Sequence, residues 1–222
     1  MITIKLFCII LFLCNEILAF EGAVVDLVAR PEKGGNLIIG TSNPGHCLES
    51  DGGVGRNIAE VLGRLNTQVD FYSSVGDDTR GIALLERIND IMGTQSNICI
   101  IEGANTATYL ALLDSDGDLH TAVADMKVLS DIPIPSEAAL SETEIMVLDA
   151  NPPIAQLIKA AKRAHKAGVR ILFEPTSVPK AAVLGHEDDF LSCLTWMTRK
   201  WALRCDVMLL MMFKCMSFYN NH

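Results

Sequence analysis

The stretch "GGVGRNIAEVLGRL", Gly52–Leu65, places three glycines among four residues directly ahead of a helical pattern. Apolar side chains recur there at spacings of three and four residues, which predicts a helix over 55–65 with one buried face. The first backbone N–H groups of such a helix have no partner within it and are free to bind a ligand. The apolar positions are Ile58, Val61, Leu62 and Leu65.

Two phosphate-binding motifs do not fit these glycines. The dinucleotide fingerprint needs a third glycine where Ile58 stands, and no Lys-Ser or Lys-Thr pair follows to complete a Walker A loop. Two interpretations remain open. One is a glycine turn that caps a helix, and the other is a site in which backbone N–H groups and the Asn57 amide bind hydroxyl groups of a polyol.

Composition limits the class of ligand. The chain has 222 residues, of which 50% are hydrophobic, and a formal net charge of -9. This length suffices for one sizeable α/β core, while the negative charge excludes a non-specific binder of nucleic-acid backbones. We therefore expect a small-molecule ligand and no nucleic acid. The seven cysteines show no metal-ligand spacing, which favours reduced thiols in the cytoplasm and argues against zinc.

The N-terminal segment 1–16 is apolar. Its uninterrupted run, Leu6–Leu13, is shorter than the roughly 20 residues that cross a bilayer, so we expect no stable membrane span. The run has the form of a signal-peptide core, although Ile17 stands where a small residue is preferred before cleavage at Ala19. Three alternatives remain for this segment. It is a secretion signal over residues 1–19, an apolar lead-in to a buried strand, or a segment that replaces the original junction with a preceding part of the protein.

From 17 to 184 short β-like runs alternate with amphipathic helices, a pattern typical of a mainly parallel sheet flanked by helices. The predicted strands are 17–28, 69–75, 145–150 and 169–175, and the predicted helices are 55–65, 78–91, 153–167 and 179–185.

Two segments depart from this alternation and predict a lid. "NLIIG" with "GHCLES" (36–50), and "TATYLALLDSDGDLHTAVADM" (106–126), resemble hairpins, because "DSDGD" is a turn between alternating runs. We expect a four-stranded flap, from about 36–49 and 106–125, able to close over a ligand. Residues 190–222 hold both tryptophans and no glycine or proline, and carry no functional motif that we recognise.

Several segments together resemble the PfkB (ribokinase-like) carbohydrate kinase family. "GGVGRNIAEVLGRL" is similar to its first signature, "GAVVDLVARP" (22–31) to its opening strand, and "SSVGDDTRG" (73–81) to its next glycine and acid turn. Four segments are most similar to the pseudouridine kinase branch of the family: "GGVGRNIAE", "TATYLALLD", "VADM" and "FEPTSVPKA". The resemblance implies a ribokinase-like three-layer α/β/α sandwich with a small β-sheet lid, occupying 17–189.

The same resemblance implies an activity and a set of ligand contacts. The activity is transfer of the ATP γ-phosphoryl group, with Mg2+, to the ribose 5'-hydroxyl of pseudouridine. Asp26, Gly52, Gly53 and Asn57 would bind the ribose, Asp125 would face the ligand, and the lid would also support a homodimer. The alternative for Asp26 and Asp125 is an ordinary solvated acid on a strand.

One departure from the family pattern bears on catalysis. The family's Gly-Ala-Gly-Asp run, which supplies the catalytic base and the anion hole, does not occur in this sequence, and neither does its Asn and Glu motif for Mg2+ and phosphates. We therefore expect no catalytic residue and no metal ligand, with the domain truncated before its nucleotide-binding part. Two hypotheses follow: an inactive portion of a nucleoside kinase whose activity resides in a longer form, or a non-catalytic nucleoside-binding fragment or splice product of a bifunctional pseudouridine kinase and pseudouridine-5'-phosphate glycosidase.

Overall fold

The computed structural model describes residues 16–194, apart from 33, 36, 93–95, 175, 178, 181 and 183–186. Its centre is a five-stranded sheet of order β5-β4-β1-β8-β9, in which every neighbouring pair runs parallel. The predicted parallel sheet is thus confirmed. The strands are β1 (Glu16–Phe20), β4 (Gln68–Gly76), β5 (Ser96–Ile101), β8 (Ile145–Asp149) and β9 (Arg170–Glu174).

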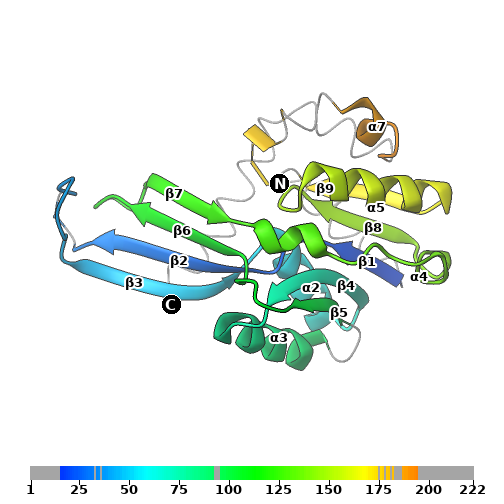
Figure 1. The fold of residues 1–222 in the computed structure, drawn as a ribbon, viewed down its shortest axis with the longest axis horizontal. Coiled ribbons are helices and arrows are strands. Elements are labelled where there is room, and N and C mark those ends of the chain that lie inside the picture. The colour runs from blue at the N-terminus through cyan, green and yellow to red at the C-terminus, as the bar shows by residue number, and fades with distance from the viewer. Residues whose placement is uncertain are drawn as a thin grey trace.

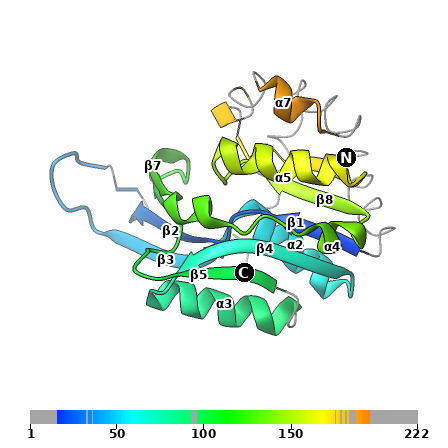
Figure 2. The same cartoon turned by 45° about the vertical axis from the view of Figure 1, so that its right-hand side comes forward.

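Helices cover both faces of this sheet, as Figure 2 shows with α5 on one side and α3 on the other. Successive residues of a strand point to opposite faces, so Leu18 and Phe20 of β1 pack in one apolar core, and Ile17 and Ala19 in a second. The first core includes α5 (Ile154–Lys166), and the second includes α2 (Val54–Arg64) and α3 (Thr79–Met92). The predicted α/β/α sandwich is confirmed.

A second sheet forms the lid and extends away from the core (Figure 1). Its order is β3-β2-β6-β7, with β2 antiparallel to β3 and parallel to β6, and β6 antiparallel to β7. The lid is therefore a mixed, four-stranded sheet. The strands are β2 (Val24–Pro31), β3 (Gly45–Gly52), β6 (Thr108–Leu113) and β7 (Leu119–Asp125).

The prediction of one strand over 17–28 was wrong, because the chain changes sheets within it. β1 ends at Phe20 in the core sheet and β2 begins at Val24 in the lid. At the change, the Glu21 N–H still donates to the Tyr72 carbonyl at 3.1 Å, whereas the Val25 N–H donates to the Ala107 carbonyl at 2.8 Å. The continuous apolar pattern conceals this step, since both strands are buried at their junction.

The lid also differs in its strands from the prediction. No strand is assigned to the described residues of 36–40; β2 supplies the partner of β3 instead. Strand β5 was not predicted, nor were the short elements η1 (Lys127–Asp131), α4 (Glu137–Ser141) and α7 (Asp188–Leu191).

The helices predicted at 55–65, 78–91 and 153–167 agree with α2, α3 and α5 to within one residue at each end. Most of the helix predicted at 179–185 lies outside the described residues, as do 1–15 and 195–222. None of the helices in the described ranges has both the length and the apolar character required to cross a membrane.

Candidate functional site

A carboxylate and a glycine turn meet where β3 enters α2. A Cβ added to Gly52 would lie 2.2 Å from the Asp26 Cγ, so only glycine lets β3 pass this close to the carboxylate. The next residue, Gly53, has a φ of 93° and lies against the carbonyl of Gly22, just past the end of β1. Both glycines are therefore required by geometry. We call Asp26, Gly52, Gly53 and Asn57 the Asp26 site.

The Asp26 carboxyl is half-buried, and burial raises its pKa to about 6, against the opposing effect of the nearby Arg56 charge. At neutral pH the group is mostly ionised and acts as a hydrogen-bond acceptor. Tyr109 stands directly opposite Asp26 in the β2–β6 register and packs against the core. Burial, with a contribution from the Asp26 charge, raises the Tyr109 pKa.

Arg56, a buried residue that the sequence did not single out, connects the parts of this site. Its Nε donates to the Gly52 carbonyl at 3.1 Å, and its Nη2 donates to Asn57 Oδ1 at 2.5 Å and to the Asp51 carbonyl at 3.3 Å. Its Nη1 pairs with Glu60 Oε2 at 2.6 Å. The guanidinium thus uses its fork of donors to join the end of β3 to the first turn of α2.

Asn57 lies exposed in the first turn of α2, and its Oδ1 is occupied by Arg56. Among the described residues no partner is assigned to its Nδ2. Asn57 therefore has N–H donors available, and Asp26 has acceptors.

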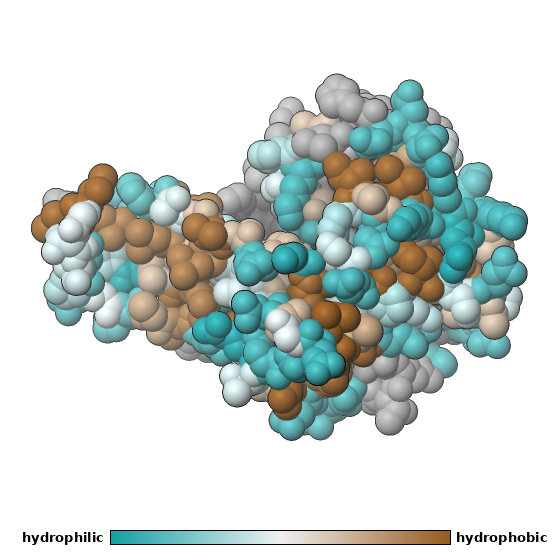
Figure 3. Space-filling model, viewed as in Figure 1, coloured by the Kyte–Doolittle hydropathy of each residue, from teal (hydrophilic) through white to brown (hydrophobic). Residues whose placement is uncertain are grey.

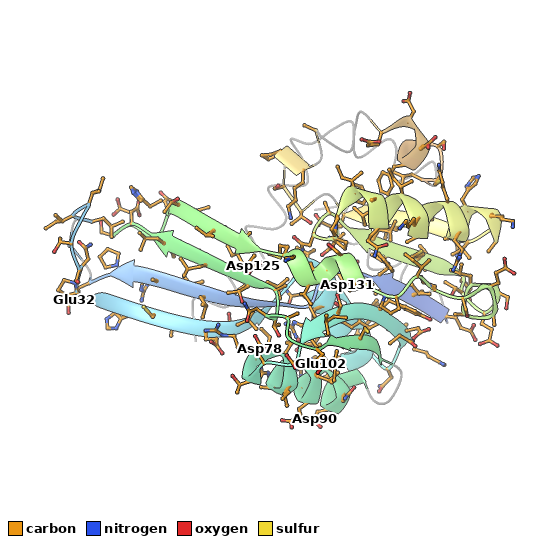
Figure 4. All side chains as sticks on the ribbon, in the orientation of Figure 1. Glu32, Asp78, Asp90, Glu102, Asp125 and Asp131 are labelled. Atoms are coloured by element: carbon orange, nitrogen blue, oxygen red, sulfur yellow. The ribbon has the colours of Figure 1, made fainter. Side chains whose placement is uncertain are left out.

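The sheet register separates Asp125 from Asp26. Asp125 stands opposite Thr108, which stands opposite Val25, whereas Asp26 belongs to the neighbouring row. Because adjacent residues leave a sheet on opposite faces, the side chains of Asp125 and Asp26 point to opposite sides of the lid. Asp125 is exposed at the end of β7 (Figure 4). Its carboxylate accepts the Lys127 N–H at 3.3 Å.

A second polar group lies at the carboxyl ends of β1, β8 and β9. We call Glu21, Asp149 and Glu174 the acid cluster; Glu21 and Asp149 are fully buried, and Glu174 is 8% exposed. Burial and the two neighbouring acids raise the Glu21 pKa well above its ordinary value, and neither Glu21 oxygen has a hydrogen-bond partner among the residues that the structure describes. Burial raises the pKa of Asp149 to about 6 and that of Glu174 to about 7. A Cβ on Gly55 would lie 1.5 Å from Glu21 Oε2.

The acid cluster is bounded by groups that hold it in place. Lys180 Nζ donates to Asn151 Oδ1 at 2.7 Å, and the Asn151 amide donates to Asp149 Oδ2 at 2.7 Å. The Thr176 N–H donates to Glu174 Oε2 at 2.8 Å, and the Thr176 hydroxyl accepts the Ala150 N–H at 3.1 Å. Thr176 therefore links the carboxyl ends of β8 and β9. These contacts favour a structural role for Thr176. Within the described residues, no three His, Cys, Asp or Glu side chains are arranged to hold a metal ion.

The protein is an α/β/α sandwich with a second, smaller sheet, and its acid cluster lies at the carboxyl ends of the core strands, where open α/β sheets bind ligands. The model of the pfkB family carbohydrate kinases matches residues 16–187. The chain belongs to this family. Kinases of the family use ATP.

Individual relatives agree with this assignment. The chain is 34% identical over 143 residues to a pseudouridine kinase of Escherichia coli, covering 63% of this chain and 45% of the relative. It is 27% identical over 163 residues to a pseudouridine kinase of Arabidopsis thaliana, covering 71% of this chain and 42% of the relative. The chain therefore spans about half the length of these two curated relatives.

Solved structures share the fold over a similar portion. A carbohydrate kinase from Agrobacterium tumefaciens superposes with a TM-score of 0.64 and 26% identity, covering 80% of this chain and 57% of that structure. A ribokinase from Thermotoga maritima gives a TM-score of 0.65 at 18% identity, covering 81% and 57%, and this likeness concerns the fold alone.

Proposed function

We propose that this chain forms the acceptor-binding portion of a nucleoside kinase of the pseudouridine kinase type, with the ribose bound at the Asp26 site. The observation that carries the proposal is the contact of Asp26 with Gly52 at the start of α2. Each hydroxyl of a ribose is both a donor and an acceptor, so it can donate to Asp26 and accept from the Asn57 amide or a backbone N–H. The pseudouridine kinases among the relatives support nucleoside as the ligand class.

Binding of pseudouridine, uridine and ribose, measured by calorimetry on the 222-residue chain, tests this proposal. We expect pseudouridine to bind. Asp26→Asn should weaken binding at least about tenfold, since hydrogen bonds to charged groups contribute roughly 1.5–3 kcal/mol, and Asn57→Ala should weaken it several-fold, since hydrogen bonds between neutral groups contribute roughly 0.5–1.5 kcal/mol. The matched control is Asp116→Asn, an exposed acid in the β6–β7 turn. Equal affinity of wild type and both site variants would refute the assignment of the site.

We propose further that the 222-residue chain does not itself phosphorylate the nucleoside. The sequence contains no Gly-Ala-Gly-Asp run, and positioning of the acceptor without a base and an anion hole does not supply the barrier reduction of phosphoryl transfer. ATP and Mg2+ would then be bound by residues outside this chain. ATP-dependent formation of pseudouridine 5'-phosphate by the purified chain would contradict this proposal.

The alternative is a non-catalytic nucleoside binder derived from a bifunctional protein. Its support is a 26% identity over 145 residues to a pseudouridine-metabolizing bifunctional protein of Schizosaccharomyces pombe, of which the chain covers 19%. A transcript read across both ends of this coding sequence distinguishes the two. Continuation into Gly-Ala-Gly-Asp supports the kinase, whereas a closed frame at His222 supports the binder.

We also propose that a second copy of the chain packs on the lid. Leu110 and Val123 face each other across β6 and β7, and their side chains are 45% and 67% exposed. Figure 3 shows hydrophobic residues gathered over the lid, and such patches mark interaction surfaces. Sedimentation should show a dimer that Val123→Lys dissociates, and a monomeric wild type would exclude the dimer.

The free cysteines Cys47, Cys99 and Cys193 support a cytoplasmic location, which cell fractionation tests.

A further inference from the structure

We propose that Arg56 is the positioning residue of the Asp26 site: it fixes the orientation of the Asn57 amide and holds Gly52 against the Asp26 carboxylate. The proposal rests on the proposed function for its ligand, but its geometry can be tested without one. Arg56 has only 5% of its surface exposed, and arginine is seldom buried to this extent unless it is fully paired.

The first step concerns the backbone. Arg56 Nε donates to the Gly52 carbonyl at 3.1 Å and Nη2 to the Asp51 carbonyl at 3.3 Å. Both carbonyls belong to Asp51 and Gly52, the last two residues of β3, where the pairing of β3 with β2 ends. Since Gly52 is in direct contact with Asp26, these bonds determine how closely β3 approaches the carboxylate.

The second step concerns the amide. The bond from Arg56 Nη2 to Asn57 Oδ1, at 2.5 Å, selects one of the two orientations of the amide. Asn57 must then offer N–H donors to the ligand. A carboxylate acceptor beside an amide donor suits a hydroxyl-rich ligand, and rejects a ligand that offers acceptors alone.

The third step concerns charge. Arg56 opposes the effect of burial on the Asp26 pKa, so it favours the ionised form of this carboxyl. Glu60 pairs with Arg56 at 2.6 Å and with Arg64 at 2.8 Å. Arg64 is the matched control because it shares the Glu60 partner and the helix, but no contact with Asp26, Gly52 or Asn57 is assigned to it in the described part of the chain.

The experiment compares Arg56→Met, Arg56→Lys and Arg64→Met in the full chain. NMR follows the Asp26 carboxyl titration and the Asn57 side-chain amide, and calorimetry follows pseudouridine binding. For Arg56→Met we expect a higher Asp26 pKa, an altered Asn57 amide signal and about tenfold weaker binding. Arg56→Lys keeps the charge without the planar fork, so it should preserve the Asp26 titration and still release Asn57. Arg64→Met should change none of the three.

The outcomes separate the two proposals. If Arg56→Met leaves the Asp26 titration and the Asn57 signal as in wild type, the positioning role is refuted whatever the ligand result. If both signals change but wild type binds none of pseudouridine, uridine and ribose, the positioning role stands and the proposed function fails. Should Arg56→Met not fold, Arg56→Lys decides, because an unchanged Asn57 amide in that folded variant overturns the proposal.

Discussion

The acid cluster should make the stability of this chain fall as the pH rises, and Glu174→Gln should remove the part of that fall that Glu174 contributes. Burial raises the Glu174 pKa from 4.5 to about 7. The folded state therefore holds this proton more tightly than the unfolded chain does. The contribution of Glu174 is fully present below pH 4.5 and is lost as the pH rises through about 7.

The size of the effect follows from the two pKa values. One pKa unit corresponds to about 1.36 kcal/mol, so the change from 4.5 to about 7 amounts to about 3 kcal/mol. Glutamine can still accept the Thr176 N–H, which lies 2.8 Å from Glu174 Oε2. The free energies of unfolding of variant and wild type should therefore agree best at pH 4.5, and differ by about 3 kcal/mol in favour of the variant at pH 9.

Urea unfolding followed by circular dichroism from pH 4.5 to 9 measures this difference. Glu142→Gln, at an exposed acid beside α4, is the control and should keep the wild-type pH dependence. Asp149, whose pKa burial raises to about 6, should leave a residual slope in the Glu174 variant. Parallel curves for Glu174→Gln and wild type across this range would show that Glu174 does not hold a proton in the folded chain.

Three further substitutions test other parts of the structure. Gly55→Ala should destabilise the chain by about 1–3 kcal/mol through overpacking against Glu21, and adding Glu21→Ala should restore thermal stability; no recovery would contradict the contact. Arg87→Ala removes the ion pair of α3 with Asp51, so hydrogen exchange should accelerate in β3 but not in β1, with a stability loss of about 0.2–1 kcal/mol. Asp125→Asn should leave pseudouridine affinity unchanged; a loss as large as that of a variant at the Asp26 site would show that Asp125 and Asp26 face the same ligand.

The helices of the core could be predicted because their apolar spacing is set by local geometry. In α5 the buried residues are Leu157, Ala160, Ala161 and Ala164, which are the positions that a helical period predicts. The division of 17–28 into two strands could not be predicted. The end of the first strand and the start of the second are both buried, so apolar and polar residues do not alternate there and the sequence gives no sign of a change of sheet.

The site was accessible to sequence reasoning only in part. Gly52 and Asn57 lie in a local motif, whereas the contact of Asp26 with Gly52 depends on strand pairing across the lid. Arg56 was missed because an arginine in a first helical turn is usually solvated. The grouping of the acid cluster could not be predicted for a related reason: Glu21, Asp149 and Glu174 are far apart in the sequence, and only the parallel topology brings their strand ends together.

The central position of β1 has a consequence for biosynthesis. Its neighbours in the sheet are β4 and β8, and Ile17 pairs with Val69 on one side and with Ile145 on the other. A nascent chain emerging from the ribosome therefore carries an apolar strand with one unpaired edge until β8 has been translated. Such long-range parallel pairing slows folding and exposes the strand to aggregation, so we expect β1 to be the segment that chaperones protect during synthesis.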